Sequence, residues 1–195
     1  MRIIGLTGGI GMGKSTAARF FMRARIPVFD ADAAVHALQA PGGRALKPIG
    51  AAFPGTVVDA TLDRAALRGA VLGKADALRR LEAIIHPMVR EEEHRFLAAA
   101  RRARKPVAVL DIPLLLETGG HRRVDLVLVV SAPRDVQIHR VGLRKRMDRA
   151  QIEAVIARQM PDRAKQRHAD VVIKTGLSRN HALRGLFRLL HTTRP

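Results

Sequence analysis

A glycine-rich segment near the N-terminus combines the residue types that bind phosphate groups. It reads Gly8-Gly9-Ile10-Gly11-Met12-Gly13-Lys14-Ser15-Thr16 and fits the spacing G-x-x-x-x-G-K-[ST]. Glycines let backbone N–H groups approach phosphate oxygens without a Cβ in the way. A lysine at this spacing reaches the β- and γ-phosphates, and the hydroxyl after it is a ligand for Mg²⁺. The segment therefore predicts a nucleoside triphosphate site at Gly9–Thr16, with Mg²⁺ held by Ser15 through the nucleotide.

The residues on either side of this loop favour the same interpretation. The apolar segment Arg2–Leu6 precedes it and is typical of a buried strand, and a helix is predicted from about Ser15 to Arg25. The alternative is a glycine-rich turn with a solvated lysine, which the strand–loop–helix setting disfavours. GTPases, ATPases and small-molecule kinases share such a loop, so other residues must indicate the reaction.

Two carboxylates follow the second predicted strand, Ile26–Phe29. They are Asp30 and Asp32. Ligands of open α/β sheets bind at the carboxyl ends of the strands, where a carboxylate can accept a proton from an attacking hydroxyl. The alternative is that one of the two caps the predicted helix Ala33–Leu38, because Asp is a favoured N-cap residue. The spacing leaves both roles open for Asp32, whereas Asp30 is expected to be structural.

A further carboxylate, Asp111, ends the predicted strand Val107–Leu110. Four apolar residues followed by Asp form a Walker B pattern, which indicates a role linked to Mg²⁺. A polar residue at a strand exit is the alternative. Two arginines, Arg140 and Arg144, lie four residues apart on one face of a helix predicted from Arg134 to about Arg146. They could clamp a triphosphate, or they could belong to an ordinary solvated basic helix.

The elements that must position these residues form an α/β pattern. Apolar segments at Leu126–Val130 and Ala169–Ile173 complete a set of strands separated by helices, which predicts a parallel sheet with right-handed crossovers. No strand is expected between Ala31 and Lys105. We predict a P-loop NTPase-type parallel sheet flanked by helices, formed by residues 1–32 and 105–195, with a small lid at about 140–159. Residues 33–104 are predicted to form a helical substrate-binding subdomain.

Composition narrows the classes of protein. Among 195 residues there is no cysteine, which excludes disulfides and cysteine-held metals, and no apolar run is long enough to span a bilayer. A cytoplasmic enzyme without a signal peptide is expected. The net charge of +18 favours an anionic partner, but an aromatic fraction of 3% disfavours nucleic acid, because bases stack on aromatic side chains. The spacing of the eight histidines predicts no transition-metal site, and the oligomeric state stays open.

Taken together, the motifs resemble the dephospho-coenzyme A kinase family along nearly the whole chain. The segments that carry the resemblance are IGLTGGIGMGKST, VFDADAAVH, LDRAAL, LEAIIHPMVR, DIPLLLE and QIHRVGLRKR, followed by Gln159-Met160. The resemblance implies that Asp32 is the catalytic base and that Lys14, Arg140 and Arg144 act on the ATP phosphates. The acceptor site that it implies consists of Asp32, His86, Arg90, Pro113, Leu114, Leu115 and Glu117. Before the resemblance is considered, the dipeptide His86-Pro87 favours a helix kink.

The resemblance implies transfer of a phosphoryl group from ATP to the ribose 3′-hydroxyl of dephospho-coenzyme A, with Mg²⁺, as the final step of coenzyme A biosynthesis. Two places depart from the family pattern. Lys174-Thr175 stands where the family usually has Asp-Asn near the adenine, and Lys145-Arg146 stands where the lid usually has a small acidic-glycine turn, which makes this lid more basic. Another small-molecule P-loop kinase, acting on a nucleoside or nucleotide, is the first alternative. A nucleotide-binding module that uses its positive charge on RNA is the second.

Overall fold

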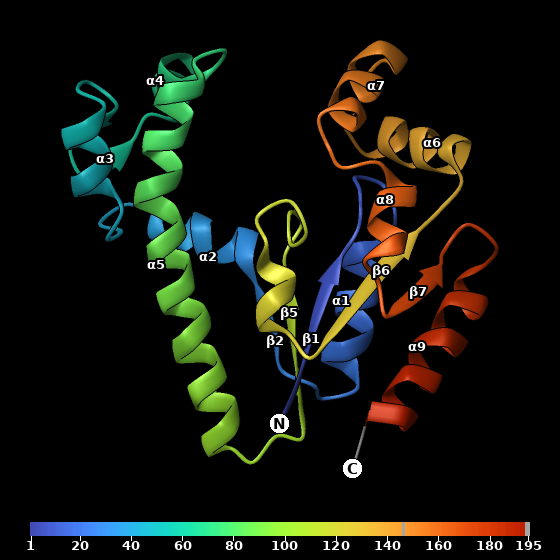
Figure 1. Cartoon of the computed structure of the whole chain (residues 1–195). Coiled ribbons are helices and arrows are strands. Elements are labelled where there is room, and N and C mark those ends of the chain that lie inside the picture. The colour runs from blue at the N-terminus through green and yellow to red at the C-terminus, as the bar shows by residue number, and fades with distance from the viewer. Residues whose placement is uncertain (146, 194–195) are drawn as a thin grey trace. The chain divides into compact units, whose positions relative to one another are not determined.

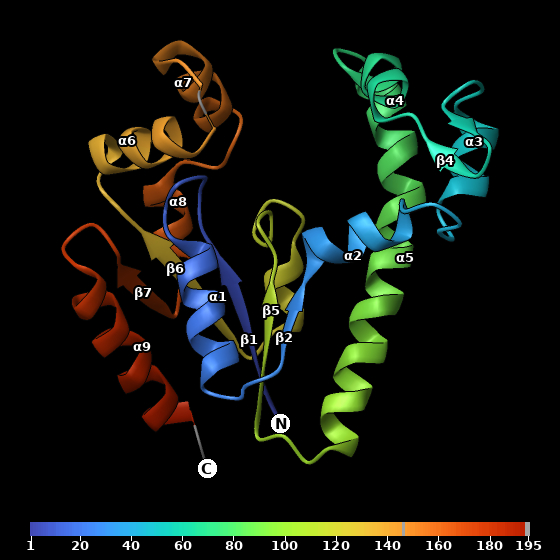
Figure 2. The same cartoon turned by 180° about the vertical axis from the view of Figure 1, so that it is seen from behind.

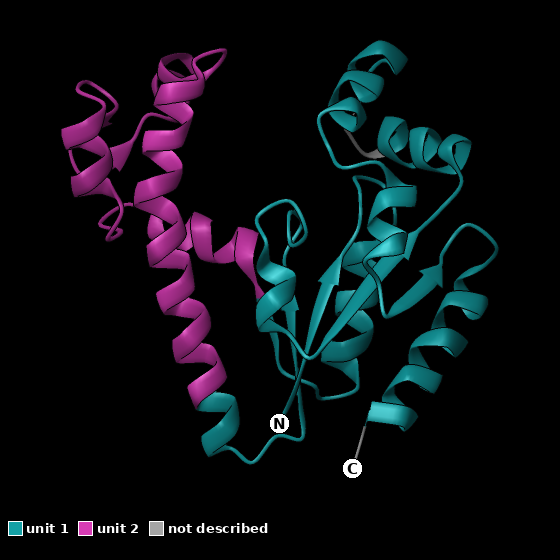
Figure 3. Ribbon diagram, viewed as in Figure 1, with its two compact units in different colours: residues 1–29, 99–195 teal, residues 30–98 magenta. Residues whose placement is uncertain are grey.

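The computed structural model describes residues 1–145 and 147–193, with the side chains of residues 144 and 145 left out. It separates into two compact units (Figure 3). The first unit contains residues 1–29 and 99–195, and the second contains residues 30–98. The long helix α5, Ala75–Arg102, belongs mostly to the second unit and ends in the first.

A five-stranded parallel sheet forms the centre of the first unit (Figure 1). Its strands are β1 (Arg2–Thr7), β2 (Val28–Asp30), β5 (Val107–Asp111), β6 (Leu126–Ser131) and β7 (Val171–Lys174). The order across the sheet is β2-β5-β1-β6-β7, and β1 pairs in parallel with both β5 and β6. Since β1 is central, the loop that follows it lies between the carboxyl ends of its neighbours. The predicted fold class is confirmed.

Helices cover both faces of this sheet (Figure 2). Those of the first unit are α1 (Lys14–Arg23), α6 (Arg134–Lys145), α7 (Arg149–Ala157), α8 (Asp162–Arg167) and α9 (Arg179–Thr193), with a 3₁₀ turn at Gly120–Arg123. Alternate residues of β6 explain the two faces, because neighbouring side chains of a strand point to opposite sides. Leu128 packs with the α1 and α9 residues, whereas Val127 and Val129 pack with Leu115 and Leu116. Both faces are apolar, as a covered parallel sheet requires.

The second unit is mainly helical. It contains α2 (Ala31–Leu38), α3 (Leu46–Ala52), α4 (Arg64–Val71) and most of α5, around a core that includes Leu46, Ile49 and Phe53. Proline at residue 87 lies inside α5, which continues through it.

The expectation that no strand lies between Ala31 and Lys105 was wrong. Two-residue strands β3 (Val57–Val58) and β4 (Thr61–Leu62) pair as an antiparallel hairpin. The turn residues Asp59 and Ala60 have φ angles of 47° and 55°, which a type I′ hairpin turn requires at both central positions. Alanine is not a residue that signals such a turn, and strands this short show no alternation, so the sequence pattern gave no indication of the hairpin.

Candidate active site

The glycine-rich loop connects β1 to α1, which begins at Lys14. Gly13 is the N-cap of α1, has φ 94°, and provides no side-chain hydrogen bond to the first turn. Gly11 also has positive φ, and a Cβ there would lie 2.7 Å from Val141 Cγ2. The loop therefore needs glycine for both conformation and space. The helix start presents N–H groups and a positive dipole end, the arrangement that binds phosphate.

The lysine of this loop is held by the carboxylate that ends β5. Lys14 Nζ donates to Asp111 Oδ1 at 2.7 Å, and the two side chains are 18% and 4% exposed. A second link, from Thr7 Oγ1 to the carbonyl oxygen of Pro113 at 2.8 Å, joins the end of β1 to the segment after β5. The ion pair holds the lysine, and the Thr7 hydrogen bond joins the ends of the two strands beside it. Ser15 is exposed at the start of α1.

A third group of contacts joins the loop to the segment after β7. Arg140 donates to the carbonyl oxygen and the hydroxyl of Thr175 at 2.7 and 3.0 Å. The Thr175 hydroxyl in turn donates to the carbonyl oxygen of Met12 at 2.8 Å. Arg140 therefore lies beside the loop, where its hydrogen bonds hold protein groups, and its predicted role at the ATP phosphates stays a prediction. The side chain of Arg144 lies outside the described part of the structure.

The two carboxylates after β2 have different surroundings. Asp30 is the N-cap of α2 and accepts a hydrogen bond from Ala33 N at 3.0 Å. Asp32 lies in the first turn of that helix, with an exposed side chain. Because Asp30 satisfies the helix start, the capping role that was open for Asp32 is excluded. The carboxylate of Asp32 remains available for chemistry.

The predicted acceptor residues are distributed over both units. His86 and Arg90, four residues apart on α5, are both exposed and share one helix face. In the segment after β5, Leu114 is exposed and Pro113 is partly buried.

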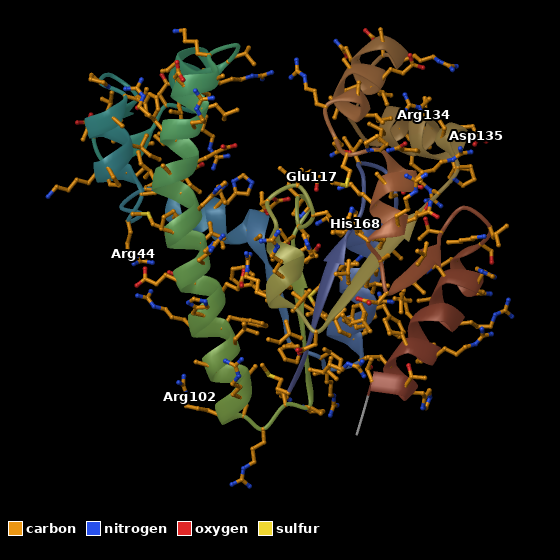
Figure 4. The ribbon with its side chains drawn as sticks, in the orientation of Figure 1. Arg44, Arg102, Glu117, Arg134, Asp135 and His168 are labelled. Carbon is orange, nitrogen blue, oxygen red and sulfur yellow. The ribbon has the colours of Figure 1, made fainter. Side chains whose placement is uncertain are left out.

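The next residues of that segment serve the fold. Leu115 is fully buried in the core. The carboxylate of Glu117, labelled in Figure 4, accepts from Lys165 Nζ at 2.6 Å and from Met160 N at 3.2 Å. Lys165 is 1% exposed, so this ion pair is largely buried. Leu115 therefore holds the segment by packing in the core, and Glu117 holds it through its contacts with Lys165 and Met160.

Sequence reasoning did not assign roles to two glutamines that contact the loop. Gln137 Nε2 donates to the carbonyl oxygen of Ile10 at 2.7 Å, and Ile10 N donates to Gln159 Oε1 at 3.0 Å. Both glutamines occur in the segments that carry the family resemblance, which was the available signal. Their contact with the loop spans more than 120 residues of sequence and could not be read from spacing.

Two cavities border the loop within the first unit. One has a volume of about 720 Å³ and is lined by residues that include Gly9, Gln137 and Gln159. The other has a volume of about 760 Å³, and its lining includes Gly13, Arg140 and Thr175. Volumes of this size suit small-molecule ligands. Among the residues that the structure describes, no cluster of His, Cys, Asp or Glu could hold a metal by itself, and no helix is long and apolar enough to cross a membrane.

A parallel sheet with β1 at its centre, a phosphate loop with its lysine fixed by a strand-end carboxylate, and a helical insert after β2 define a P-loop kinase. Comparisons with known proteins specify the family. A sequence model described as "Dephospho-CoA kinase" matches residues 2–179. A dephospho-CoA kinase of Gluconobacter oxydans is 54% identical over 198 residues, which cover 100% of this chain and 98% of the relative.

Solved structures share the fold of this chain. The protein TT1252 from Thermus thermophilus superposes with a TM-score of 0.87 at 33% identity, covering 98% of this chain and 96% of that one. A dephospho-CoA kinase from Campylobacter jejuni shares the fold, with a TM-score of 0.65 at 19% identity and coverage of 99% and 97%. The chain belongs to the dephospho-CoA kinase family and has its activity, the ATP-dependent phosphorylation of dephospho-CoA in the final step of coenzyme A biosynthesis. The predicted family and enzyme class are confirmed.

Proposed function

We propose that the enzyme transfers the γ-phosphoryl group of ATP to the ribose 3′-hydroxyl of dephospho-CoA, with Asp32 accepting the hydroxyl proton. The observation that carries this proposal is the difference between the surroundings of Asp30 and Asp32. Asp30 caps α2, whereas Asp32 has an exposed carboxylate in the turn directly after strand β2. A carboxylate at a strand end is where an acceptor hydroxyl of an α/β enzyme is expected to bind.

On the nucleotide side, the backbone of Gly9–Thr16 would cradle the ATP phosphates. Lys14, which Asp111 holds at 2.7 Å, would contribute its charge to the β- and γ-phosphates. The residues present also fit Mg²⁺, because a hydroxyl at Ser15 and a carboxylate at Asp111 are the oxygen ligands that this ion prefers beside phosphates. When bound, Mg²⁺ would neutralise charge on the transferred group.

Arg140 is proposed to stabilise the phosphates from the side of α6. Its guanidinium already lies against the loop, because Nη1 donates to Gly11 O at 3.5 Å and to the Thr175 hydroxyl, and Nη2 donates to the Thr175 carbonyl oxygen. A planar guanidinium can keep one set of hydrogen bonds and offer its remaining N–H groups to a phosphate. The same role for Arg144, and a lid at about residues 140–159, stay predictions.

On the acceptor side, His86 and Arg90 are proposed to bind dephospho-CoA from the exposed face of α5, and the acceptor role of Pro113 and Leu114 stays a prediction. An exposed arginine suits the pyrophosphate of the acceptor, since guanidinium and phosphate form paired hydrogen bonds. Residues 33–104 as a substrate-binding subdomain would exclude water, which otherwise competes with the acceptor for the γ-phosphoryl group.

Thr175 is proposed to shape the nucleotide site without reading the base through its side chain. Its hydroxyl donates its only hydrogen to Met12 O and also accepts from Arg140, so the protein already uses its donor. Backbone groups of this segment would then contact the adenine. A cytoplasmic location is proposed with this function, because ATP and dephospho-CoA are the two substrates.

The proposal is tested by a phosphoryl-transfer assay with purified protein, Mg²⁺ and a panel of acceptors and nucleoside triphosphates. We expect ADP and coenzyme A to form at equal rates with dephospho-CoA, and nucleoside monophosphates to be poor acceptors. Faster transfer to a nucleoside monophosphate than to dephospho-CoA would contradict the assigned acceptor. The panel of triphosphates measures how selective the site is for adenine.

A further inference from the structure

Both backbone polar groups of Ile10, in the middle of the phosphate loop, are hydrogen-bonded to glutamine side chains. Gln159, just after α7, accepts from Ile10 N at 3.0 Å, and Gln137 of α6 donates to Ile10 O at 2.7 Å. Gln137 is only 2% exposed. Both amides also meet Gly9, where an added Cβ would lie 3.3 Å from Gln137 Nε2 and from Gln159 Oε1. The two side chains thus form a clamp around one segment of the loop.

The segment that carries Gln159 is itself anchored from the opposite side. The next residue, Met160, donates its N–H to Glu117 Oε1 at 3.2 Å, and the same oxygen accepts from Lys165 at 2.6 Å. Lys165 is 1% exposed, so its charge is desolvated and holds the carboxylate strongly in place. Figure 4 shows Glu117 in the segment that follows β5. A continuous set of contacts therefore runs from a buried ion pair, through the backbone at Met160, to the phosphate loop.

The loop needs such support because its own residues provide little. Ile10 lies between Gly9 and Gly11, and Gly11 and Gly13 have φ angles of 74° and 94°. Glycines reach these conformations readily but lose more conformational entropy than other residues when they become ordered. A loop of this composition keeps one shape only if neighbouring groups hold its peptides. The hydrogen bonds to Ile10 N and to Ile10 O hold the two peptide groups that flank this residue before ATP binds.

We infer that Gln137 and Gln159 are positioning residues that hold the phosphate loop in its ATP-binding shape, and that Glu117 supports ATP binding by anchoring the Gln159 segment. This inference rests on the proposed ATP site at residues 9–16. It also changes the role of Glu117, which the family resemblance had placed in the acceptor site. The carboxylate oxygen Oε1 of Glu117 accepts hydrogen bonds from Lys165 and from Met160 N, and these bonds hold the side chain beside the segment that contacts the phosphate loop.

The first test is Gln159→Leu, which keeps a similar volume and removes the acceptor for Ile10 N. The loss of one hydrogen bond predicts a rise of about tenfold in the KM for ATP, while the KM for dephospho-CoA stays within about twofold. The matched control is Thr192→Val near the end of α9, which likewise removes one side-chain hydrogen bond, the one that the Thr192 hydroxyl donates to Leu189 O at 3.0 Å. The control is expected to change the KM for ATP by less than twofold. An unchanged KM for ATP in Gln159→Leu, or an equal rise in the control, would overturn the inference.

The second test separates the two roles of Glu117. Glu117→Gln keeps the size of the side chain and an oxygen that can accept from Met160 N, and it removes the charge that pairs with Lys165. We expect the KM for ATP to rise several-fold with no change for dephospho-CoA, and the thermal midpoint checks that the variant is folded. A rise in the KM for dephospho-CoA alone would place Glu117 at the acceptor and remove it from the network.

A third variant distinguishes failure of the inference from failure of the ATP-site assignment. Lys14→Ala should raise the KM for ATP whether or not the glutamines matter. If Lys14→Ala weakens ATP use and Gln159→Leu does not, the glutamine clamp alone is wrong. If neither variant changes ATP use, the loop is not the nucleotide site. The double variant Gln137→Met with Gln159→Leu should raise the KM for ATP more than either single change.

Discussion

The ion pairs that hold the phosphate loop and its supports in the first unit differ in burial from those of Arg44 in the second. In the first unit, Lys14 pairs with Asp111 and Lys165 pairs with Glu117, and the partners are 97 and 48 residues apart in the sequence. In the second unit, Arg44 pairs with neighbouring glutamates of α5, and these side chains are 33–48% exposed. The first unit therefore contains two largely buried ion pairs between distant elements, besides the exposed pair of Arg149 with Glu153 in α7, whereas the pairs of Arg44 in the second unit are exposed.

This difference has an energetic consequence. Removing one partner of a buried pair leaves a desolvated charge and is strongly destabilising, whereas exposed pairs contribute little. The ion pairs of Lys14 and Lys165 therefore hold the nucleotide half, which is the first unit, in its folded arrangement before any substrate binds. In the helical half, Asp32, His86 and Arg90 are exposed, so they remain free to bind an acceptor. Variants of the two halves should therefore affect different kinetic constants.

The largest effect is expected for Asp32→Asn, which removes the proposed base. Turnover should fall by about 10²–10⁴, the range for loss of a general base, while the KM for ATP stays near its original value. The matched control is Asp30→Asn, because Asn caps a helix about as well as Asp and should leave turnover nearly unchanged. Equal losses of turnover in both variants, measured by steady-state kinetics, would show that Asp32 has a structural role and is not the base.

The next effect is expected for Lys14→Ala in the nucleotide half. Loss of a charge that stabilises the transferring group predicts a fall in kcat/KM for ATP of about 10²–10³. Asp111 also loses its ion pair with Lys14, so the thermal midpoint should fall as well. Unchanged kinetics with a lowered thermal midpoint would show that this lysine is structural and would contradict the proposed ATP site.

A smaller effect, confined to the acceptor, is expected for Arg90→Ala. Loss of one guanidinium contact with a phosphate predicts a rise of about tenfold in the KM for dephospho-CoA and no change in the KM for ATP. Arg95 is a matched control on the same helix, because it pairs with Glu91 and Glu92. Arg95→Ala should leave both constants unchanged, and an equal effect of the two variants would remove the assignment of Arg90.

The smallest effect concerns the pH dependence of stability in the helical half. The hydrogen bond from Arg44 lowers the pKa of Glu91 below its ordinary value of 4.5. A lowered pKa in the folded state means that the pair stabilises the fold above about pH 4.5 and loses this contribution as the pH falls through the lowered pKa. Because both groups are exposed, the change should be slight. Denaturation midpoints of the original protein and Arg44→Gln should differ at pH 6 and converge in acid, and a constant difference would contradict the assignment.

Local patterns in the sequence were sufficient for the sheet, the phosphate loop and most of the helices that flank the sheet, but not for α8. Strand β6 and the loop before Lys14 carry their own signals, because burial on both faces gives an apolar run and phosphate binding demands glycine. The choice between Asp30 and Asp32 could not be made in this way. Both residues fit an N-cap, and only the hydrogen bond from Ala33 N decides between them.

Sequence patterns could not predict contacts between segments that are far apart in the chain. The short helix α8 contains Lys165, whose pairing with Glu117 joins segments 48 residues apart. Gln159 contacts Ile10 across 149 residues. Glutamine has no preferred function that its position in a helix would reveal, so its role depends on what the fold brings beside it. Site residues that act through such contacts require the structure.

The central claim is that ATP held by the loop of the first unit phosphorylates a hydroxyl of dephospho-CoA beside Asp32. It is tested most directly by following the label from γ-labelled ATP into product and determining which oxygen of the acceptor carries it. The account predicts that the label appears on the ribose 3′-oxygen of coenzyme A, and that Asp32→Asn abolishes most of this transfer while ATP still binds. Label in another position, or transfer that is unaffected in Asp32→Asn, would contradict it.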